Sequence, residues 1–403
     1  MPEVFIVDAV RTPIGKLGGV LAHVRPDDLA AHVMRALMGR NPSVDPGLVE
    51  DVVWGAANQA GEDNRDVARI AALLAGLPIE VGGVTVNRLC GSSLQATIQA
   101  VQAMRDGWGG VMIAGGSESM SRAPLVMMTK PTAPFRPGLP EMADTTLGWR
   151  LVNPRWHDHY RSLGMGETAE EVAERWSVGR EAQDAFALES HRRAVAAIDD
   201  GRLGAQLAPL EAPRDARGRT SHLVDVDEGP RRDASLEAMA GLRPVFREGG
   251  TVTAGNASQM NDGAAALLLA TGETVERLGL EPMARVLTGA VAGVHPDIMG
   301  TGPIPATRKA LDRAGLTVDD IGLVELNEAF ASQAIVCRDE LGFDPSIVNV
   351  NGGAIANGHP LGASGAKILT SLVHEMGLRG VRHGLATMCI GVGQGVALVV
   401  EAV

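Results

Sequence analysis

VNRLCGSSLQATIQAV, residues 86–101, is the stretch of sequence that indicates the fold. After Cys90, apolar residues recur with the spacing of one helix face, which predicts a helix that begins beside this cysteine. GHPLGASGAK, residues 358–367, leads into a second amphipathic helix, and its Ser364 stands 274 positions after Cys90 (364 against 90). The same offset relates the strand-like segments that follow the two helices, so the sequence predicts two related halves.

Strand-like and helix-like segments alternate in both halves. Val4–Val10 and Val111–Gly116 are short apolar runs typical of strands, whereas residues 29–37 have the spacing of an amphipathic helix. Cys389 ends a strand-like run that corresponds to Val111–Gly116 under the same offset. Sheets that are covered by helices on their faces produce this alternation. The predicted fold class is therefore α/β.

A different kind of sequence separates the two halves. Residues 120–250 contain several prolines, one helical stretch at Glu167–Ile198 and a charged loop at Glu211–Asp233. This region is too long for a connector, so we expect an inserted, mostly surface subdomain. TVTAGNAS, residues 251–258, then returns to a buried sheet composition. The predicted domains are a first half at residues 1–119 and 251–275, the inserted subdomain at 120–250, and a second half at 276–403.

Composition and charge exclude several classes of protein. The formal net charge of −12 argues against a groove that binds nucleic-acid phosphates. The chain has no run of about 18 apolar residues, so no membrane span is expected. Three cysteines without a CxxC pair fit neither a disulfide framework nor a zinc site, and no metal is expected. The first residues do not resemble a secretory leader, which favours a cytoplasmic, reducing location.

Cys90 is the first candidate for catalysis. A helix N-terminus presents free backbone N–H groups and a partial positive charge, and both favour a thiolate over a thiol. The alternative is a buried structural cysteine, but the neighbouring glycine and serines favour a nucleophile. Cys337 lies inside an apolar helical run and is expected to fill the core.

Three further polar residues stand at strand ends or on glycine-rich loops. His359, in the glycine-rich segment 351–365, is the best candidate for a base. Asn327 and Cys389 follow or end strands, where α/β sheets place their sites. Two cysteines, a histidine and an asparagine suit thioester chemistry with carbon acids. The histidines of the polar insertion are expected to be solvated: His157, His159 and His191.

Several motifs, in order along the chain, resemble those of the thiolases, the acetyl-CoA C-acyltransferases. They are VNRLCGSS (residues 86–93), GGSESMSRAP (115–124), ELNEAF (325–330), NGGAIANGHPLGASG (351–365) and CIGVGQG (389–395). The resemblance covers essentially the whole chain. It implies the thiolase fold: two similar βαβαβαββ halves packed as a five-layer α-β-α-β-α sandwich, with a loop subdomain inserted in the first half.

The resemblance also implies roles for the candidate residues. Cys90 resembles the nucleophile that becomes acylated, and His359 resembles the base that activates it and later the incoming CoA thiol. Cys389 resembles the acid and base that exchanges a proton with the α-carbon of acetyl-CoA. Asn327 would hold a water that forms, with His359, an oxyanion hole for the enolate. The backbone N–H groups of Cys90 and Gly391 would form a second hole for the tetrahedral intermediates.

Coenzyme A is the implied substrate, and no permanently bound cofactor is expected. Arg231 and Arg232 offer local positive charge to the CoA phosphates, with a solvated surface charge as the equal alternative for Arg232. The implied partners are acyl-CoA substrates, without nucleic acid or membrane, and the implied assembly is a homotetramer, a dimer of dimers joined through the insertion. The resemblance places CoA contacts at Met165, Arg231, Ala254, Ser258, Ala329 and Phe330.

The implied activity is reversible: cleavage of a 3-ketoacyl-CoA by CoA, as in fatty acid β-oxidation, or condensation of two acetyl-CoA molecules. DTTLGWRLVNP, residues 144–154, is more similar to the 3-oxoadipyl-CoA thiolases of aromatic degradation and to some broad bacterial acetyltransferases, and the former give an alternative substrate class. The chain departs from the usual thiolase pattern at Asn357, Gln259 and Ser117. These departures affect the expected shape of the pocket and leave the catalytic groups in place.

Two functions of other classes are the alternatives. A non-catalytic thiolase-fold subunit that binds acyl-CoA is expected to lack a catalytic residue, whereas all four are present here. A nicotinamide-dependent oxidoreductase would need GxGxxG directly after the first strand, followed by an acidic residue at the usual distance. The chain has no such arrangement, and we expect a thiolase.

Overall fold

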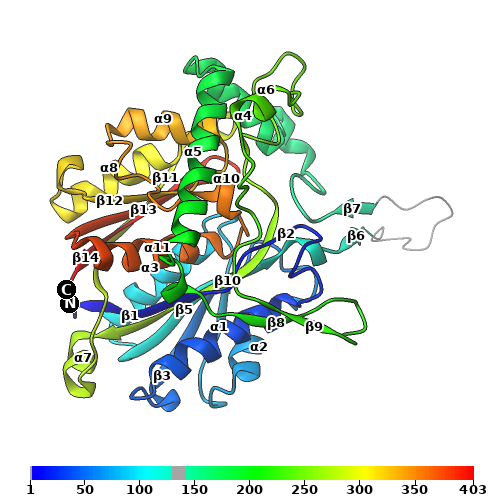
Figure 1. Ribbon diagram of the computed structural model, residues 1–403. Coiled ribbons are helices and arrows are strands. Elements are labelled where there is room, and N and C mark those ends of the chain that lie inside the picture. The colour runs from blue at the N-terminus through cyan, green and yellow to red at the C-terminus, as the bar shows by residue number, and fades with distance from the viewer. Residues whose placement is uncertain (1, 129–141) are drawn as a thin grey trace.

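The computed structural model describes residues 2–128 and 142–403, and its centre is one 10-stranded sheet (Figure 1). In the middle, β1 and β11 are antiparallel neighbours that pair at only two positions, Phe5 with Arg285 and Ile6 with Ala284. The sheet therefore has two parts that meet along a short seam. Across the sheet, the strands are β12 (Leu323–Leu326), β13 (His383–Ile390), β14 (Gln394–Ala402), β11 (Ala284–Gly293), β1 (Val4–Arg11), β10 (Asn261–Thr271), β5 (Val111–Ser119), β3 (Val49–Gly55) and β4 (Val84–Val86), with β2 (Gly15–Lys16) beside β10.

The two parts of the sheet have the same connectivity, which explains the constant offset in the sequence. In the first part, β3 and β5 are parallel neighbours, and β5 pairs antiparallel with β10. In the second part, β12 and β13 are parallel neighbours, and β13 pairs antiparallel with β14. The predicted α/β fold with two similar halves is therefore confirmed.

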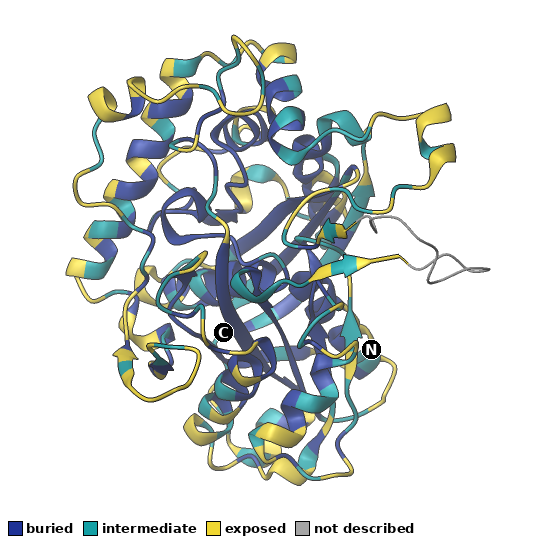
Figure 2. Ribbon diagram, turned by 90° about the vertical axis from the view of Figure 1, so that its right-hand side faces the viewer, coloured by how far each residue is buried: buried dark blue, intermediate teal, exposed yellow. Residues whose placement is uncertain are grey.

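Helices form three layers around and between the two parts of the sheet. Figure 2 shows the strands among the most buried elements, while exposed residues gather on the outer helices. This packing confirms the predicted five-layer order α-β-α-β-α. From one outer face to the other, the helices are α1 (Pro26–Arg40) and α2 (Val67–Ala75), then the central pair α3 (Ser92–Arg105) and α11 (Ser364–Arg379), then α8 (Pro303–Ala314) and α9 (Ala331–Leu341).

The central helix pair shares one apolar core with both parts of the sheet. Leu94 and Ile98 of α3 and Leu369 and Leu372 of α11 are buried there together with strand residues from both parts. Burial of apolar surface, worth about 25 cal/mol per Å², is the main favourable contribution to such packing. The two helices approach closely because Gly365 has no side chain: a Cβ there would lie 2.4 Å from the backbone nitrogen of Leu94.

Within the described residues, the chain between β5 and β10 adds no strand to the main sheet. The pairs β6–β7 and β8–β9 form separate two-stranded sheets, and β6–β7 projects from the body of the molecule (Figure 1). The predicted subdomain boundaries at 120 and 250 stay a prediction. The strands and α-helices of this region are β6 (Leu125–Met127), β7 (Met142–Asp144), α4 (Met165–Arg175), α5 (Arg180–Asp199), β8 (Leu210–Pro213), β9 (Ser221–Val224) and α6 (Leu236–Ala240). Elsewhere in the described chain, the remaining α-helices are α7 (Gly272–Leu278) and α10 (Ala354–Asn357).

Three expectations about this region are wrong in detail. The helical stretch Glu167–Ile198 is two helices, because the chain turns between them through Ser177, whose φ of 56° is in the left-handed region. The charged loop Glu211–Asp233 begins with the β8–β9 pair. TVTAGNAS forms no strand, because the carboxylate of Glu170 accepts hydrogen bonds from two backbone N–H groups at its start (2.9 and 2.8 Å).

No helix of the described chain is long and apolar enough to cross a membrane.

Replacement of Gly365 by alanine tests the close approach of α3 and α11. The added methyl group would collide with the backbone of α3, so we expect Tm to fall, in line with about 1–3 kcal/mol for an overpacked core. Gly377→Ala on the same helix is the matched control: its Cβ would meet nothing within 4 Å, and alanine is the better helix former, so Tm should rise slightly. A Gly365→Ala protein as stable as the wild type would argue against this packing.

Candidate active site

A cavity of about 680 Å³, which we call the main cavity, lies where the loops before the two central helices meet the end of β13. Cys90 precedes α3, His359 precedes α11, and Cys389 is the second-last residue of β13. The structure therefore brings the predicted reacting groups and the predicted CoA contacts to one place. Nine of the residues predicted from the sequence line this cavity: Cys90, His359, Cys389, Met165, Arg231, Ala254, Ser258, Ala329 and Phe330.

Asn327 and Gly391, the other two predicted residues, are outside the lining of this cavity. Asn327 follows β12 and is buried, and its side-chain oxygen and nitrogen have no hydrogen-bond partner in the described part of the chain. Buried amides are nearly always hydrogen-bonded, so this side chain has unused capacity for a water molecule. Gly391 follows β13, and its backbone N–H is close enough to the Cys90 thiol to lower the pKa of that thiol.

Cys90 is half-buried as a residue, yet its sulfur has lost its hydration. The pKa of the Cys90 thiol is raised to about 11, mainly by this desolvation and also by Glu118, against the N–H groups of Gly391 and of Cys90 itself, which act to lower it. Burial of the sulfur therefore opposes the thiolate form that the start of α3 was expected to favour. Burial also raises the pKa of Cys389, and so does the neighbouring Cys90. Both sulfurs are thiols and need a base for ionisation.

His359 is oriented as a base with a free Nε2. Its Nδ1 lies 2.6 Å from Oγ of Ser364, and that hydroxyl donates its hydrogen to the carbonyl oxygen of Pro360 at 2.8 Å. Nδ1 must therefore carry the imidazole hydrogen, which leaves the lone pair on Nε2. Nε2 is buried and has no partner among the described residues. Burial, together with the nearby Lys367, lowers the pKa of His359 to about 3, so the ring is neutral.

The loop that carries His359 is held by Asn261, a residue for which the sequence suggested no role. The backbone N–H of His359 donates to Oδ1 of Asn261 at 2.8 Å, and Nδ2 of Asn261 donates to the carbonyl oxygen of Gly15 at 2.9 Å. Gly358 permits this approach, since its φ is +90° and a Cβ there would lie 2.5 Å from the Asn261 side chain. A residue of the first half thus positions a loop of the second.

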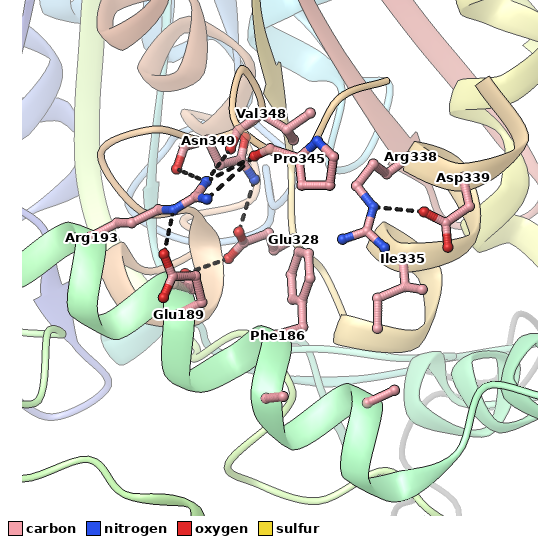
Figure 3. Close-up of a pocket in the computed structure, with 13 residues that line it drawn as sticks. Phe186, Glu189, Arg193, Glu328, Ile335, Arg338, Asp339, Pro345, Val348 and Asn349 are labelled. Atoms are coloured by element: carbon pink, nitrogen blue, oxygen red, sulfur yellow. Dashed lines mark hydrogen bonds and ion pairs between the residues drawn. The ribbon is translucent and has the colours of Figure 1, made fainter. Parts of the chain in front are cut away.

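Glu328, next to Asn327, joins three segments of the chain, and Figure 3 shows its hydrogen bond with Asn349. Its Oε2 accepts hydrogen bonds from Oγ of Ser190 at 2.7 Å and from the backbone N–H of Ile355 at 3.2 Å. Its Oε1 accepts from Nδ2 of Asn349 at 2.8 Å. Glu328 lies in the wall of a separate cavity of about 380 Å³ between α5 and α9. This buried carboxyl fixes the loop of Asn327 against the glycine-rich loop before α11.

The two arginines predicted for phosphate binding have different surroundings. Arg231 is exposed and lines the main cavity, and its backbone N–H donates to Nδ1 of His191 at 3.2 Å. Arg232 forms an exposed ion pair with Asp199 (2.6 Å), which fits the alternative of a surface charge. The expectation that His191 is solvated is wrong: it is buried on α5, and this burial lowers its pKa to about 4. The other two histidines that were predicted to be solvated are exposed: His157 and His159.

The three departures from the usual pattern remove no reacting group. Gln259 lines the main cavity. Ser117 is buried in β5, where its Oγ accepts a hydrogen bond from the indole N–H of Trp54 at 3.0 Å. Asn357 is buried, and its Nδ2 donates to two backbone carbonyls of the glycine-rich loop (3.2 and 3.0 Å). Asn357 therefore ties this loop together, two residues before His359.

Comparison with known proteins leads to the same protein family as the motifs in the sequence. The thiolase N-terminal domain matches residues 4–273, and the thiolase C-terminal domain matches residues 280–402. The chain therefore belongs to the thiolase family. It is an acyltransferase of CoA thioesters, a class that uses CoA as substrate and needs no permanent cofactor.

The relatives of the chain match it over its whole length. It is 51% identical to the 3-oxoadipyl-CoA/3-oxo-5,6-dehydrosuberyl-CoA thiolase of Escherichia coli (strain K12), with 100% of both chains covered. It is 54% identical to the beta-ketoadipyl-CoA thiolase of Pseudomonas aeruginosa, with 100% of this chain and 99% of that protein covered. Among solved structures, the acetyl-CoA acetyltransferase of Bacillus anthracis matches with a TM-score of 0.91 at 40% identity, covering 100% of this chain and 99% of that one.

Titration of Cys90 tests the desolvation of its sulfur. The difference in thiolate ultraviolet absorbance between the wild type and Cys90→Ser should stay flat from about pH 6 to 9 and rise only toward a midpoint near about pH 11. Cys337→Ser is the matched control. Cys337 is buried in the core of α8 and α9, as predicted, and this burial raises the pKa of its thiol to about 12. A midpoint between about pH 5 and 8 for Cys90 would show a stabilised thiolate and disprove this description.

Proposed function

We propose that the chain cleaves 3-ketoacyl-CoA thioesters with CoA by a ping-pong mechanism in which Cys90 carries the acyl group. The observation that supports this most is that Cys90, His359 and Cys389 line one cavity together with the positions predicted for CoA. A desolvated thiol, a neutral imidazole with a free Nε2 and a second buried thiol suit the transfer of an acyl group between sulfurs.

In the first half-reaction, Sγ of Cys90 bonds to the C3 carbonyl carbon of the substrate while Nε2 of His359 takes the thiol proton. The C2–C3 bond then breaks, and acetyl-CoA leaves as an enolate that takes the proton of Cys389 at its α-carbon. The proton on His359 passes to the Cys389 sulfur, so both groups regain their starting protonation. The low pKa of His359, about 3, favours this release.

In the second half-reaction, His359 takes the proton of the CoA thiol, and the CoA sulfur attacks the thioester carbon on Cys90. The intermediate collapses to the shortened acyl-CoA, and the Cys90 sulfur recovers the proton from His359. The N–H groups of Cys90 and Gly391 would bind the oxygen of each tetrahedral intermediate. Asn327, with a water and His359, would bind the enolate oxygen, and its unpartnered amide supports this role.

For the acyl group, the proposed substrate is 3-oxoadipyl-CoA, which would be cleaved to succinyl-CoA and acetyl-CoA. Relatives whose names include this substrate are 51% and 54% identical over the full length. Their names favour a dicarboxylic substrate over a part in fatty acid β-oxidation. Residues 144–154, the segment whose pattern suggests the same class, contribute several side chains to a cavity that includes Cys90.

The proposed assembly is a homotetramer, a dimer of dimers. β4 is an edge strand of the main sheet, and Val84 in it and Ile79 before it are exposed. An exposed edge strand favours pairing with another chain. The β6–β7 pair carries further exposed apolar side chains: Leu125, Met127 and Met142. Contacts between copies would cover both surfaces.

Incubation with acetyl-CoA, followed by intact-mass measurement, tests the roles of the two cysteines. The wild type should gain an acetyl group, whereas Cys90→Ala should gain none and should lose cleavage activity by more than about a thousandfold. Cys389→Ser should still be acetylated on Cys90 but should exchange the α-proton of acetyl-CoA at least about a hundredfold more slowly. Near-normal cleavage by Cys90→Ala, or unchanged exchange in Cys389→Ser, would remove the respective role.

A comparison of kcat/KM tests the proposed substrate. We expect 3-oxoadipyl-CoA to exceed acetoacetyl-CoA and a medium-chain 3-ketoacyl-CoA by at least about tenfold, because its distal carboxylate can form charge-assisted hydrogen bonds. The highest value for the medium-chain thioester would indicate a β-oxidation enzyme instead. The highest value for acetoacetyl-CoA would indicate an acetyl-CoA acetyltransferase.

A further inference from the structure

A second cavity, of about 290 Å³, opens at Cys90 and differs from the main cavity in its walls. The two cavities share Cys90 and several apolar neighbours, but of the predicted CoA contacts only Met165 lines the second one. When CoA fills the main cavity, an acyl group on Cys90 must occupy this second space, which we call the acyl branch. Its own walls include Asn58, Asn87, Leu89, Trp149, Arg150 and Val392.

Arg150 is the one cationic side chain among the described residues that line the acyl branch. It is half-buried, and within the described part of the chain its guanidinium donates a single hydrogen bond, from Nη1 to the carbonyl oxygen of Thr145 at 3.3 Å. It forms no salt bridge within the described chain. A guanidinium has five N–H donors, so most of the donors of Arg150 are available to a ligand.

The one carboxyl group in the described lining of the acyl branch, Glu118, already has partners of its own. Its Oε2 accepts hydrogen bonds from the backbone N–H groups of Ala57 (3.0 Å) and Gly362 (2.9 Å), and its Oε1 accepts from the N–H of Asn58 (3.2 Å). Burial raises the pKa of Glu118 to about 8, so this carboxyl is largely protonated near neutral pH. Among the described residues of the branch, the positive charge of Arg150 therefore has no carboxylate partner.

The position of Arg150 is fixed by the segment that precedes it. Thr145 is buried, and its Oγ1 donates to the carbonyl oxygen of Pro124 at 2.6 Å and accepts from Nδ2 of Asn58 at 2.9 Å. The indole N–H of Trp149 donates to a backbone carbonyl at 2.9 Å. These contacts tie both ends of the short segment 145–149 to the body of the protein. Arg150 is thus held at the wall of the branch.

We infer that Arg150 binds the distal carboxylate of a dicarboxylic acyl group carried on Cys90. This inference rests on the proposed function, in which Cys90 is the acyl carrier. A guanidinium pairs with a carboxylate through two parallel hydrogen bonds, a strong and directional contact. A wholly apolar acyl chain would leave the half-buried guanidinium without a partner, which is unfavourable. Arg150 therefore selects substrates that end in a carboxylate.

The length of the acyl group determines how far its distal carboxylate lies from the cysteine. Cleavage of 3-oxoadipyl-CoA would leave a four-carbon diacid on Cys90. Fully extended, its bonds place the carboxylate carbon about 5 Å from the sulfur. A monocarboxylic acyl group of the same length ends there in a methyl group, which offers nothing to a guanidinium.

The test compares kcat/KM for 3-oxoadipyl-CoA and for acetoacetyl-CoA in the wild type, Arg150→Met and Arg155→Met. Loss of the charge-assisted pair should lower the ratio of the two values by about ten- to a hundredfold in Arg150→Met. Arg155→Met is the matched control, because Arg155 follows five residues later in the chain, is exposed and lines neither cavity. This control should keep the ratio within about twofold of the wild type.

Two further measurements separate this inference from the proposed function. Arg150→Lys keeps the charge but not the paired geometry, and its ratio should fall between those of Arg150→Met and the wild type. Acetylation of wild-type Cys90 by acetyl-CoA is read by intact mass, and its absence overturns the proposed function itself. If Cys90 is acetylated but the ratio in Arg150→Met falls less than tenfold, or falls equally in Arg155→Met, the inference about Arg150 alone is overturned.

Discussion

The structure depends on the close packing of α3 and α11 between the two parts of the sheet. Gly365 lets the two helices touch, and Gly91 lets the start of α3 approach β13, since a Cβ at Gly91 would lie 2.6 Å from the side chain of Ile390. This packing brings together three segments that are far apart in the sequence, and each carries one of the proposed reacting groups. Leu89 and Val392, which flank the site, have positive φ values of 47° and 65°. Such conformations cost about 1–3 kcal/mol each and persist because the surrounding packing enforces them.

Burial determines the electrostatic state of the site. Cys90 and Cys389 are thiols and His359 is neutral, because desolvation disfavours the charged form of every group. In the proposed mechanism, charge appears only on the substrate oxygens during the reaction, where the N–H of Gly391 and the amide of Asn327 would stabilise it. A neutral resting site thus suits repeated transfer of an acyl group between sulfurs.

The positions of the candidate reacting groups could be predicted because short local motifs encode them. The motifs place two cysteines and His359 at strand ends or before helices, and the constant offset predicts two similar halves. The ionisation of Cys90, the burial of His191 and the contacts of Glu328 could not be predicted, since each depends on segments that meet only in the folded chain. The break in the long helical stretch follows from the left-handed turn at Ser177, which hydrophobic spacing does not reveal.

The central claim is that Cys90 carries the acyl group between the main cavity and the acyl branch. The electron density of crystals soaked with acetyl-CoA tests this claim most directly. We predict an acetyl group on Sγ of Cys90, with its carbonyl oxygen at the N–H groups of Cys90 and Gly391, and CoA in the cavity lined by Arg231 and Ser258. An acetyl group on Cys389, or CoA bound outside that cavity, would contradict the claim.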